Sequence, residues 1–189
     1  MKYIFYCRDS KRINTNSVDD KLPNNCTFDI LRPKICRIVP NGITTLANRT
    51  LMIGMCFSYW VMRYCRLFSD FDYSIYMVQS GRKIVHYSVI LSKFFKFPFM
   101  GENDIQIGPC WTDNEYRRKG IHSFIIRKIL DTYQNRGNFK FWYITREDNI
   151  ASRRSIQKAE FIQYGKGKRI RRFGLSVFGK FIIQNMNGS

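Results

Sequence analysis

A short basic turn carries the residues whose types and spacing best suit chemistry. Three cations, Arg117, Arg118 and Lys119, precede Gly120, and a helical pattern begins directly afterwards at Ile121. The first amides of a helix lack partners within it and carry partial positive charge. A glycine at this point lets an anion approach the backbone closely. The turn therefore predicts a phosphate or pyrophosphate site, with an ordinary basic surface turn as the alternative.

Hydrophobic spacing predicts the elements that must position this turn. Apolar residues recur at helical intervals after Gly120, and β-rich runs lie before and after that helix. We expect a loop over 9–25, helices over 46–68, 121–133 and 149–159, strands over 2–8, 35–39, 73–79, 83–91, 104–112 and 139–145, and a twisted hairpin from 161 onward. A strand–helix–strand–helix–strand run behind an antiparallel hairpin predicts an α/β (α+β) fold. Its central sheet is expected to be mixed, mostly antiparallel and flanked by helices.

Composition limits the class of protein. The chain has 189 residues, of which 44% are hydrophobic and 24% are charged. These values suit one globular domain and exclude a mostly disordered chain. Lys and Arg number 32 against 14 Asp and Glu, so the formal net charge is +18. Such a chain attracts anions, including phosphorylated cofactors, nucleic acid and acidic lipids, and charge alone does not choose among them.

The apolar stretches and the cysteines indicate the compartment. The apolar residues 3–7 are too few for a secretory signal. Residues 50–62 are uncharged, but a membrane-spanning helix needs about 20 residues. We expect a buried core helix there and no transmembrane segment, with a helix on a membrane surface as the alternative. The six cysteines form no Cys-x-x-Cys pair and no metal-ligand spacing with histidine, so free thiols, no metal and a cytoplasmic location are expected.

The segment from Ile105 to Phe161 resembles the GNAT superfamily of acyl-CoA N-acyltransferases. Its motifs occur in the family's order: a strand, a glycine turn that opens a helix, a second strand, and a short helix that begins near an asparagine. The matching residues are Arg117-Arg118-Lys119-Gly120-Ile121-His122, Asn149, Ser152, Lys158 and Phe161. With the preceding hairpin, the likeness covers residues 73–165. The run 107–112 also resembles bacterial members linked to surface-polysaccharide and amino-sugar synthesis.

The resemblance implies a single GNAT domain over residues 1–189. Residues 73–165 would form the acyl-CoA-binding core, residues 1–70 a variable part on the acceptor side, and residues 166–189 a basic terminal hairpin. It further implies acetyl-CoA as the acyl-donor substrate, whose pyrophosphate would be held beside Arg117 by the backbone around Arg118, Lys119, Gly120, Ile121, His122 and Ser123. The pantetheine arm would pair with the strand end formed by Cys110, Trp111 and Thr112, where one amide stabilises the oxyanion. Asn149 and Ser152 would contact the arm where two strands separate.

Three positions depart from the family pattern. His122 stands where glycine or alanine is usual, and Glu160 replaces the glycine before Phe161. Ile156 occupies the position at which many members place a tyrosine that protonates the leaving thiolate. The general acid is therefore not inherited. Ser155, next to that position, is the candidate replacement, with water as the alternative.

The general base must also come from this chain's own residues. An amine acceptor arrives largely as ammonium, so a group near neutral pKa is needed to take its proton. His86 lies in a strand expected beside strand 104–112, and its reference pKa of about 6.5 suits that task. A hydrogen-bonded structural histidine is the alternative. Gln106 cannot act as a base, but it can orient a water molecule.

The leading hypothesis is transfer of an acetyl group from acetyl-CoA to a small-molecule amine by direct attack in a ternary complex. An amino sugar, or its nucleotide-linked form, is the expected acceptor, and the cations of residues 166–172 are a candidate clamp for its phosphate. The alternatives are sugar O-acetylation, an inactive acyl-CoA-binding protein and a basic nucleic-acid-binding module. The aromatic residues lack the Lys/Arg interleaving of a stacking platform, so no specific nucleic acid is expected. A monomer or a homodimer is expected.

Overall fold

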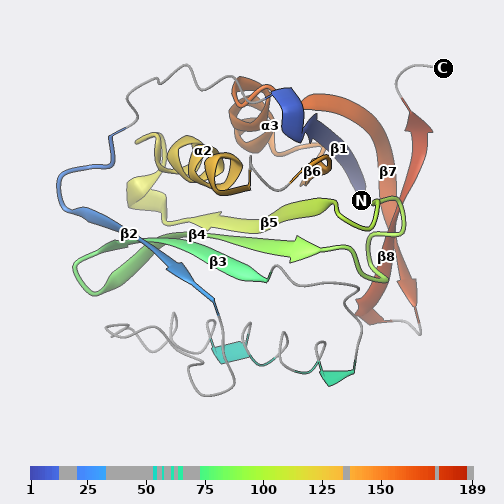
Figure 1. The fold of residues 1–189 in the computed structure, drawn as a ribbon, viewed down its shortest axis with the longest axis horizontal. Helices are drawn as coiled ribbons and strands as arrows, with labels where there is room; N and C mark the ends of the chain where they lie inside the picture. The colour runs from blue at the N-terminus through green and yellow to red at the C-terminus, as the bar shows by residue number, and fades with distance from the viewer. Residues whose placement is uncertain are drawn as a thin grey trace.

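One eight-stranded sheet organises the part of the chain that the computed structural model describes, namely residues 1–12, 21–32, 73–133, 137–172 and 175–186 with the isolated positions 53, 54, 57, 61, 64 and 65. The sheet order is β2-β3-β4-β5-β6-β1-β7-β8 (Figure 1). The strands are β1 (Lys2–Asp9), β2 (Cys26–Leu31), β3 (Ser74–Ser80), β4 (Lys83–Ser92), β5 (Ile105–Thr112), β6 (Lys140–Arg146), β7 (Ile162–Arg172) and β8 (Leu175–Met186). Apart from the isolated positions between 53 and 65, the helices of the described ranges are α2 (Ile121–Tyr133), α3 (Ile150–Lys158) and two 3-10 turns, Ser10–Arg12 and Asn114–Tyr116.

The pairing between β5 and β6 sets the shape of the centre of the sheet. This pair is parallel, whereas the other neighbouring strands run antiparallel. Parallel neighbours need a crossover, and α2 supplies it. The ladder joins Ile105–Ile107 to Phe141–Tyr143 and ends there, so the remaining residues of β5 and β6 are not paired with each other. The two strands therefore part beyond Ile107 and Tyr143.

Two apolar clusters pack on the two faces of the sheet. Both α2 and α3 lie on one face (Figure 1), where apolar residues at helical spacing bury one side of α2. Its buried side chains are Ile121, Ile125, Ile126, Ile129, Leu130 and Tyr133. The second cluster contains Trp142 of β6 and the aromatic residues of the segment after β4, Phe94 and Phe97. The expected mixed, mostly antiparallel sheet with helices packed against it is confirmed.

Several predicted elements match, and others need correction. The bounds of α2 agree with the prediction. The two strands of the hairpin, β5 and β6 differ from it by one residue at one or both ends. Strand β2, which pairs with β3, was not predicted, and the expected loop over 9–25 begins with a 3-10 turn. The expected strand 35–39 lies outside the described residues, as does most of the expected helix 46–68. None of the helices within the described ranges has the length and hydropathy to cross a bilayer.

The isolated positions described between 53 and 65 bear on the expected core helix. Ile53, Phe57 and Tyr64 have helical backbone and are 41%, 57% and 79% exposed. The prediction that this segment is buried was therefore wrong at Ile53 and Phe57. An uncharged run shows that its residues can be buried. It does not identify which of these residues pack against another element.

Candidate active site

A cleft lies where β5 and β6 part, beside the first turns of α2 and α3. Its volume is about 590 Å³. It collects most of the predicted donor-binding residues: Cys110, Trp111, Thr112, Arg117, Arg118, Gly120, Ile121, His122, Ser123, Asn149 and Ser152. Ser155, predicted as a catalytic residue, also lines it, whereas Lys119, His86 and Gln106 do not. Three lining residues were not predicted: Tyr116, Tyr143 and Ala151.

The mouth of the cleft is the exposed positive end of α2. Arg118 and Gly120 adopt positive φ angles of 64° and 76°, which turn the chain sharply into the helix. The first hydrogen bond of the helix is donated by the Phe124 amide to the Gly120 carbonyl at 3.0 Å. The amides of residues 121–123 therefore precede the helical ladder, and no acidic side chain lies in the first turn. This end of α2 suits an anion.

Side chains of the preceding turn hold its shape. The Asp113 carboxylate accepts from the Glu115 amide at 3.0 Å and pairs with Lys83 at 2.8 Å. Lys119 Nζ lies 4.8 Å from the centre of the Tyr116 ring, and Lys119 does not line the cleft. Arg117 Nε donates to the Thr112 carbonyl at 3.3 Å. The turn is thus fixed against the end of β5.

The floor of the cleft is a cluster of neutral polar groups between α2 and α3. His122 Nδ1 lies 2.8 Å from Ser155 Oγ, and His122 Nε2 lies 3.4 Å from Tyr143 Oη. Tyr143 Oη also lies 2.9 Å from Ser152 Oγ. Burial lowers the pKa of His122 to about 4, and burial raises the pKa of Tyr143 well above its usual value. Imidazole and phenol are both neutral at pH 7.

The start of α3 forms the remaining wall. Asn149 caps this helix, because its side-chain oxygen accepts from the Ser152 amide at 3.1 Å. The cap fixes Ser152 and, one turn later, Ser155 along the cleft side of the helix. Ile156 is fully buried in the apolar cluster beneath α3. The family's tyrosine position has thus become a core position here.

The two histidines, His86 and His122, differ in accessibility. His86 is fully buried, with Nδ1 2.7 Å from Thr112 Oγ1 and Nε2 2.9 Å from Ser88 Oγ. Ser88 Oγ donates to Cys110 Sγ at 3.1 Å. His86 therefore stands behind the cleft wall, one hydrogen bond from Thr112. Burial lowers its pKa to about 3, and the nearby His122 ring adds to that shift.

His86 should make stability depend on pH in a defined window. The unfolded side chain titrates near 6.5 and the folded one near 3, so the unfolded state binds more protons between these values. The free energy of unfolding should therefore fall on acidification below about pH 6.5, by about 1.4 kcal/mol per pH unit for this one group. Urea unfolding between pH 6 and pH 4.5 measures the slope. The variant His86→Gln should flatten it by about one proton, and an unchanged slope would show that His86 is not buried as a neutral ring.

Two further predicted residues lie on the strand that leads to the cleft. Gln106 is 3% exposed; its Nε2 donates to the Ile107 carbonyl at 3.0 Å, and its Oε1 has no hydrogen-bond partner among the described residues. Asp104 is buried and accepts three hydrogen bonds, which gives it a structural role. Within the described residues, no group of His, Cys, Asp and Glu side chains is arranged to hold a metal ion.

The Glu160 departure is compensated within the fold. Glu160 adopts a φ of 60°, a conformation that glycine adopts without cost. Its carboxylate pairs with the buried Arg8 guanidinium at 2.9 Å, and Arg8 also donates to the Ala159 carbonyl. An ion pair to β1 therefore holds the turn after α3 in place.

Comparison with known proteins agrees with this geometry. A tandem GNAT protein from the clavulanic acid biosynthesis pathway aligns at 12% identity with a TM-score of 0.59, over 86% of this chain and 50% of that one. A functionally unknown conserved protein from Staphylococcus epidermidis ATCC 12228 aligns at 14% identity with a TM-score of 0.50, over 87% and 58%. This chain thus spans half the length of the first structure and 58% of the second, and at these identities the likeness shows the fold alone.

Sequence comparison identifies the family. No curated protein sequence matches the chain. The model of the acetyltransferase (GNAT) family matches residues 53–161, more than half of the chain, and this range contains the glycine turn, the strand junction and the start of α3. The chain belongs to the acetyltransferase (GNAT) family.

Proposed function

We propose that this protein transfers an acetyl group from acetyl-CoA to a small-molecule amine in the cytoplasm, by direct attack within a ternary complex. The observation that carries the proposal is that one cleft combines two surfaces of different chemistry. Its mouth is an anion-binding helix end, and its floor is neutral and rich in hydroxyl groups. A charged pyrophosphate and an uncharged thioester arm require these two surfaces in this order.

The residues of the cleft have distinct roles in this proposal. The amides of Ile121, His122 and Ser123 bind the pyrophosphate, with Arg117 and Arg118 beside them. The end of β5 at Cys110 and Thr112 pairs with β4 but not with β6, and its free side offers backbone groups to the pantetheine arm, as an added strand would need. An amide of this strand end donates to the oxygen that becomes negative when the amine attacks.

The proton of the attacking amine needs a route out of the site. The neutral, fully buried His86 is unsuited to accept it directly, and we assign His86 a positioning role through Thr112. Gln106 has a buried oxygen without a partner among the described residues, which suits an ordered water molecule. Gln106 stands behind the cleft lining, and water held by it relays the proton onward from the site, whereas Ser155 lines the cleft on the α3 side.

We assign the acceptor to the amino sugars or their nucleotide-linked forms. A formal net charge of +18 favours a phosphorylated acceptor. The exposed cations Lys168 and Arg171 of β7 supply a surface for it, whereas Lys166 pairs with Glu147 at 2.8 Å. Comparing glucosamine with glucosamine 6-phosphate as acceptors tests whether the acceptor carries a phosphate.

Ligand binding and thiol release test the proposed function. Acetyl-CoA at 100 times its dissociation constant should stabilise the fold by about 2.7 kcal/mol, a rise of roughly 5–10 °C in Tm, and ADP should stabilise it less. Free thiol should then appear with an amine from a panel of glucosamine, glucosamine 6-phosphate, lysine and an alanine-terminated peptide. Stabilisation without thiol release from any amine would indicate an acyl-CoA-binding protein, and release with hydroxyl acceptors alone would indicate O-acetylation. The absence of stabilisation would overturn the proposal.

A further inference from the structure

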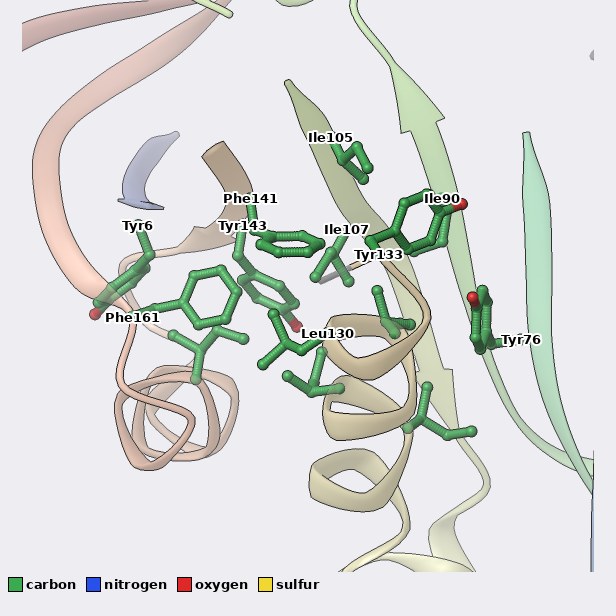
Figure 2. Packing of buried hydrophobic residues seen from close by; sticks show 14 of the residues in the cluster. Tyr6, Tyr76, Ile90, Ile105, Ile107, Leu130, Tyr133, Phe141, Tyr143 and Phe161 are labelled. Carbon is green, nitrogen blue, oxygen red and sulfur yellow. The ribbon is translucent and has the colours of Figure 1, made fainter. Parts of the chain in front are cut away.

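Tyr143 occupies the point where the two central strands part. Its residue pair with Ile107 is the last one of the parallel ladder. Figure 2 shows its ring extending from β6 into the layer of helices, beside Phe141 and Phe161. The side chain is 5% exposed and lines the cleft. A phenol is thus placed at the closed end of the space that β5 and β6 leave open.

A continuous hydrogen-bonded path leads from this phenol to a partly exposed hydroxyl. Tyr143 Oη contacts His122 Nε2 at 3.4 Å, and His122 Nδ1 contacts Ser155 Oγ at 2.8 Å. Ser152 Oγ, 2.9 Å from Tyr143 Oη, holds the phenol from the α3 side. All four residues line the cleft. When Ser155 donates to Nδ1, Nε2 carries the ring proton and donates to Oη, which leaves the phenolic proton directed away from His122.

The other side chains at this junction are poor proton donors. Ile156 is fully buried and apolar. Cys110 Sγ already accepts from Ser88 at 3.1 Å, and burial raises its pKa to about 11. A second sulfur buried beside Cys110 is shielded from water in the same way, so a thiolate formed there is more basic than one in water. Such a thiolate is a suitable partner for a phenol.

This inference rests on the proposed function, because it concerns the sulfur of the acyl donor. We propose that the Tyr143 hydroxyl protonates the departing coenzyme A sulfur, and that His122 and Ser155 restore the proton. The carbon–sulfur bond breaks with its electron pair on sulfur, the Oη–H bond breaks and an S–H bond forms. The Nε2 proton passes to Oη, the Ser155 proton passes to Nδ1, and water supplies Ser155. Over the whole reaction, the amine releases one proton and the thiolate gains one.

The first test uses free coenzyme A, so it needs no acceptor. Tyr143→Phe keeps the ring and removes the hydroxyl, and Tyr133→Phe is the matched control, a buried tyrosine of the same apolar cluster whose Oη lies 3.4 Å from Ser74 Oγ. The pKa of the bound thiol is read from the ultraviolet absorbance of the thiolate, with complexes of desulfo-coenzyme A as the reference. Tyr143→Phe should raise that pKa by about one unit, because a donor to the thiolate is lost, and Tyr133→Phe should leave it unchanged.

Turnover supplies the second test. Tyr143→Phe should lower kcat at least tenfold, with the KM for acetyl-CoA within threefold of the wild type. Ser155→Ala should lower kcat without moving the pKa of the bound thiol, which separates resupply of the proton from its donation. If the wild type binds no coenzyme A, the proposed function itself fails. If it binds coenzyme A and Tyr143→Phe leaves the thiol pKa or kcat unchanged, only the role of Tyr143 is overturned.

Discussion

Gly120→Asp should weaken coenzyme A binding at least 100-fold while leaving the protein folded. A Cβ atom built on Gly120 meets no other atom within 4 Å, so the substitution creates no clash inside the protein. It places a carboxylate at the helix end where the pyrophosphate is expected. Two like charges about 5 Å apart near a protein surface repel by about 3 kcal/mol. A 100-fold change in dissociation constant corresponds to about 2.7 kcal/mol.

Gly81→Asp is the matched control for this variant. Gly81 adopts a φ of 58° against 76° at Gly120, and its Cβ also meets open space, but it lies at the tip of the β3–β4 hairpin. Aspartate tolerates this backbone conformation better than most residues, so both variants should unfold at similar urea concentrations. Calorimetric titration with coenzyme A should show wild-type affinity for Gly81→Asp. Equal affinity in both variants would place the pyrophosphate elsewhere.

At the candidate site, the sequence predicted the features that depend on local backbone geometry. A glycine that opens a helix after a strand specifies its own local geometry, and the cleft contains that turn as expected. The bounds of α2 were predictable for a similar reason, because its apolar spacing and the glycine after it, Gly137, are local signals. The asparagine at the start of α3 likewise caps the helix through a contact three residues away.

Features that depend on distant residues could not be predicted. In the sequence, Tyr143 is one of several apolar residues of a predicted strand. Its proposed role as a proton donor depends on where the ladder with β5 ends. His86 has the reference pKa of a base, but its contacts with Thr112 and Ser88 and its complete burial arise from strand packing. No local pattern places β1 between β6 and β7, because long-range pairing decides sheet order. The ion pair that supports Glu160 comes from this placement of β1, which carries Arg8.

Asp104→Ala should cost about 4 kcal/mol of unfolding free energy, a large share of the 5–15 kcal/mol typical of a domain. The carboxylate is 8% exposed and accepts from the Gly101 amide at 2.8 Å, the Lys140 amide at 2.9 Å and Trp142 Nε1 at 2.7 Å. It therefore ties the segment before β5 to the start of β6, next to the first residue pair of the parallel ladder, Ile105 with Phe141. Alanine leaves three donors without their acceptor, at about 1–3 kcal/mol for each buried one.

A graded series separates the loss of these hydrogen bonds from the loss of charge. In Asp104→Asn the amide oxygen can take the place of Oδ2, which serves Gly101 and Trp142, so that only the Lys140 amide loses its acceptor. This variant should lose roughly half as much stability as Asp104→Ala. Asp131→Ala removes the same charge from an exposed position of α2 and should change stability by less than about 0.5 kcal/mol. Urea unfolding followed by circular dichroism ranks the three variants. Equal losses for Asp104→Ala and Asp131→Ala would mean that β5 and β6 are aligned by their ladder alone, and the geometry of the cleft would then not depend on this carboxylate.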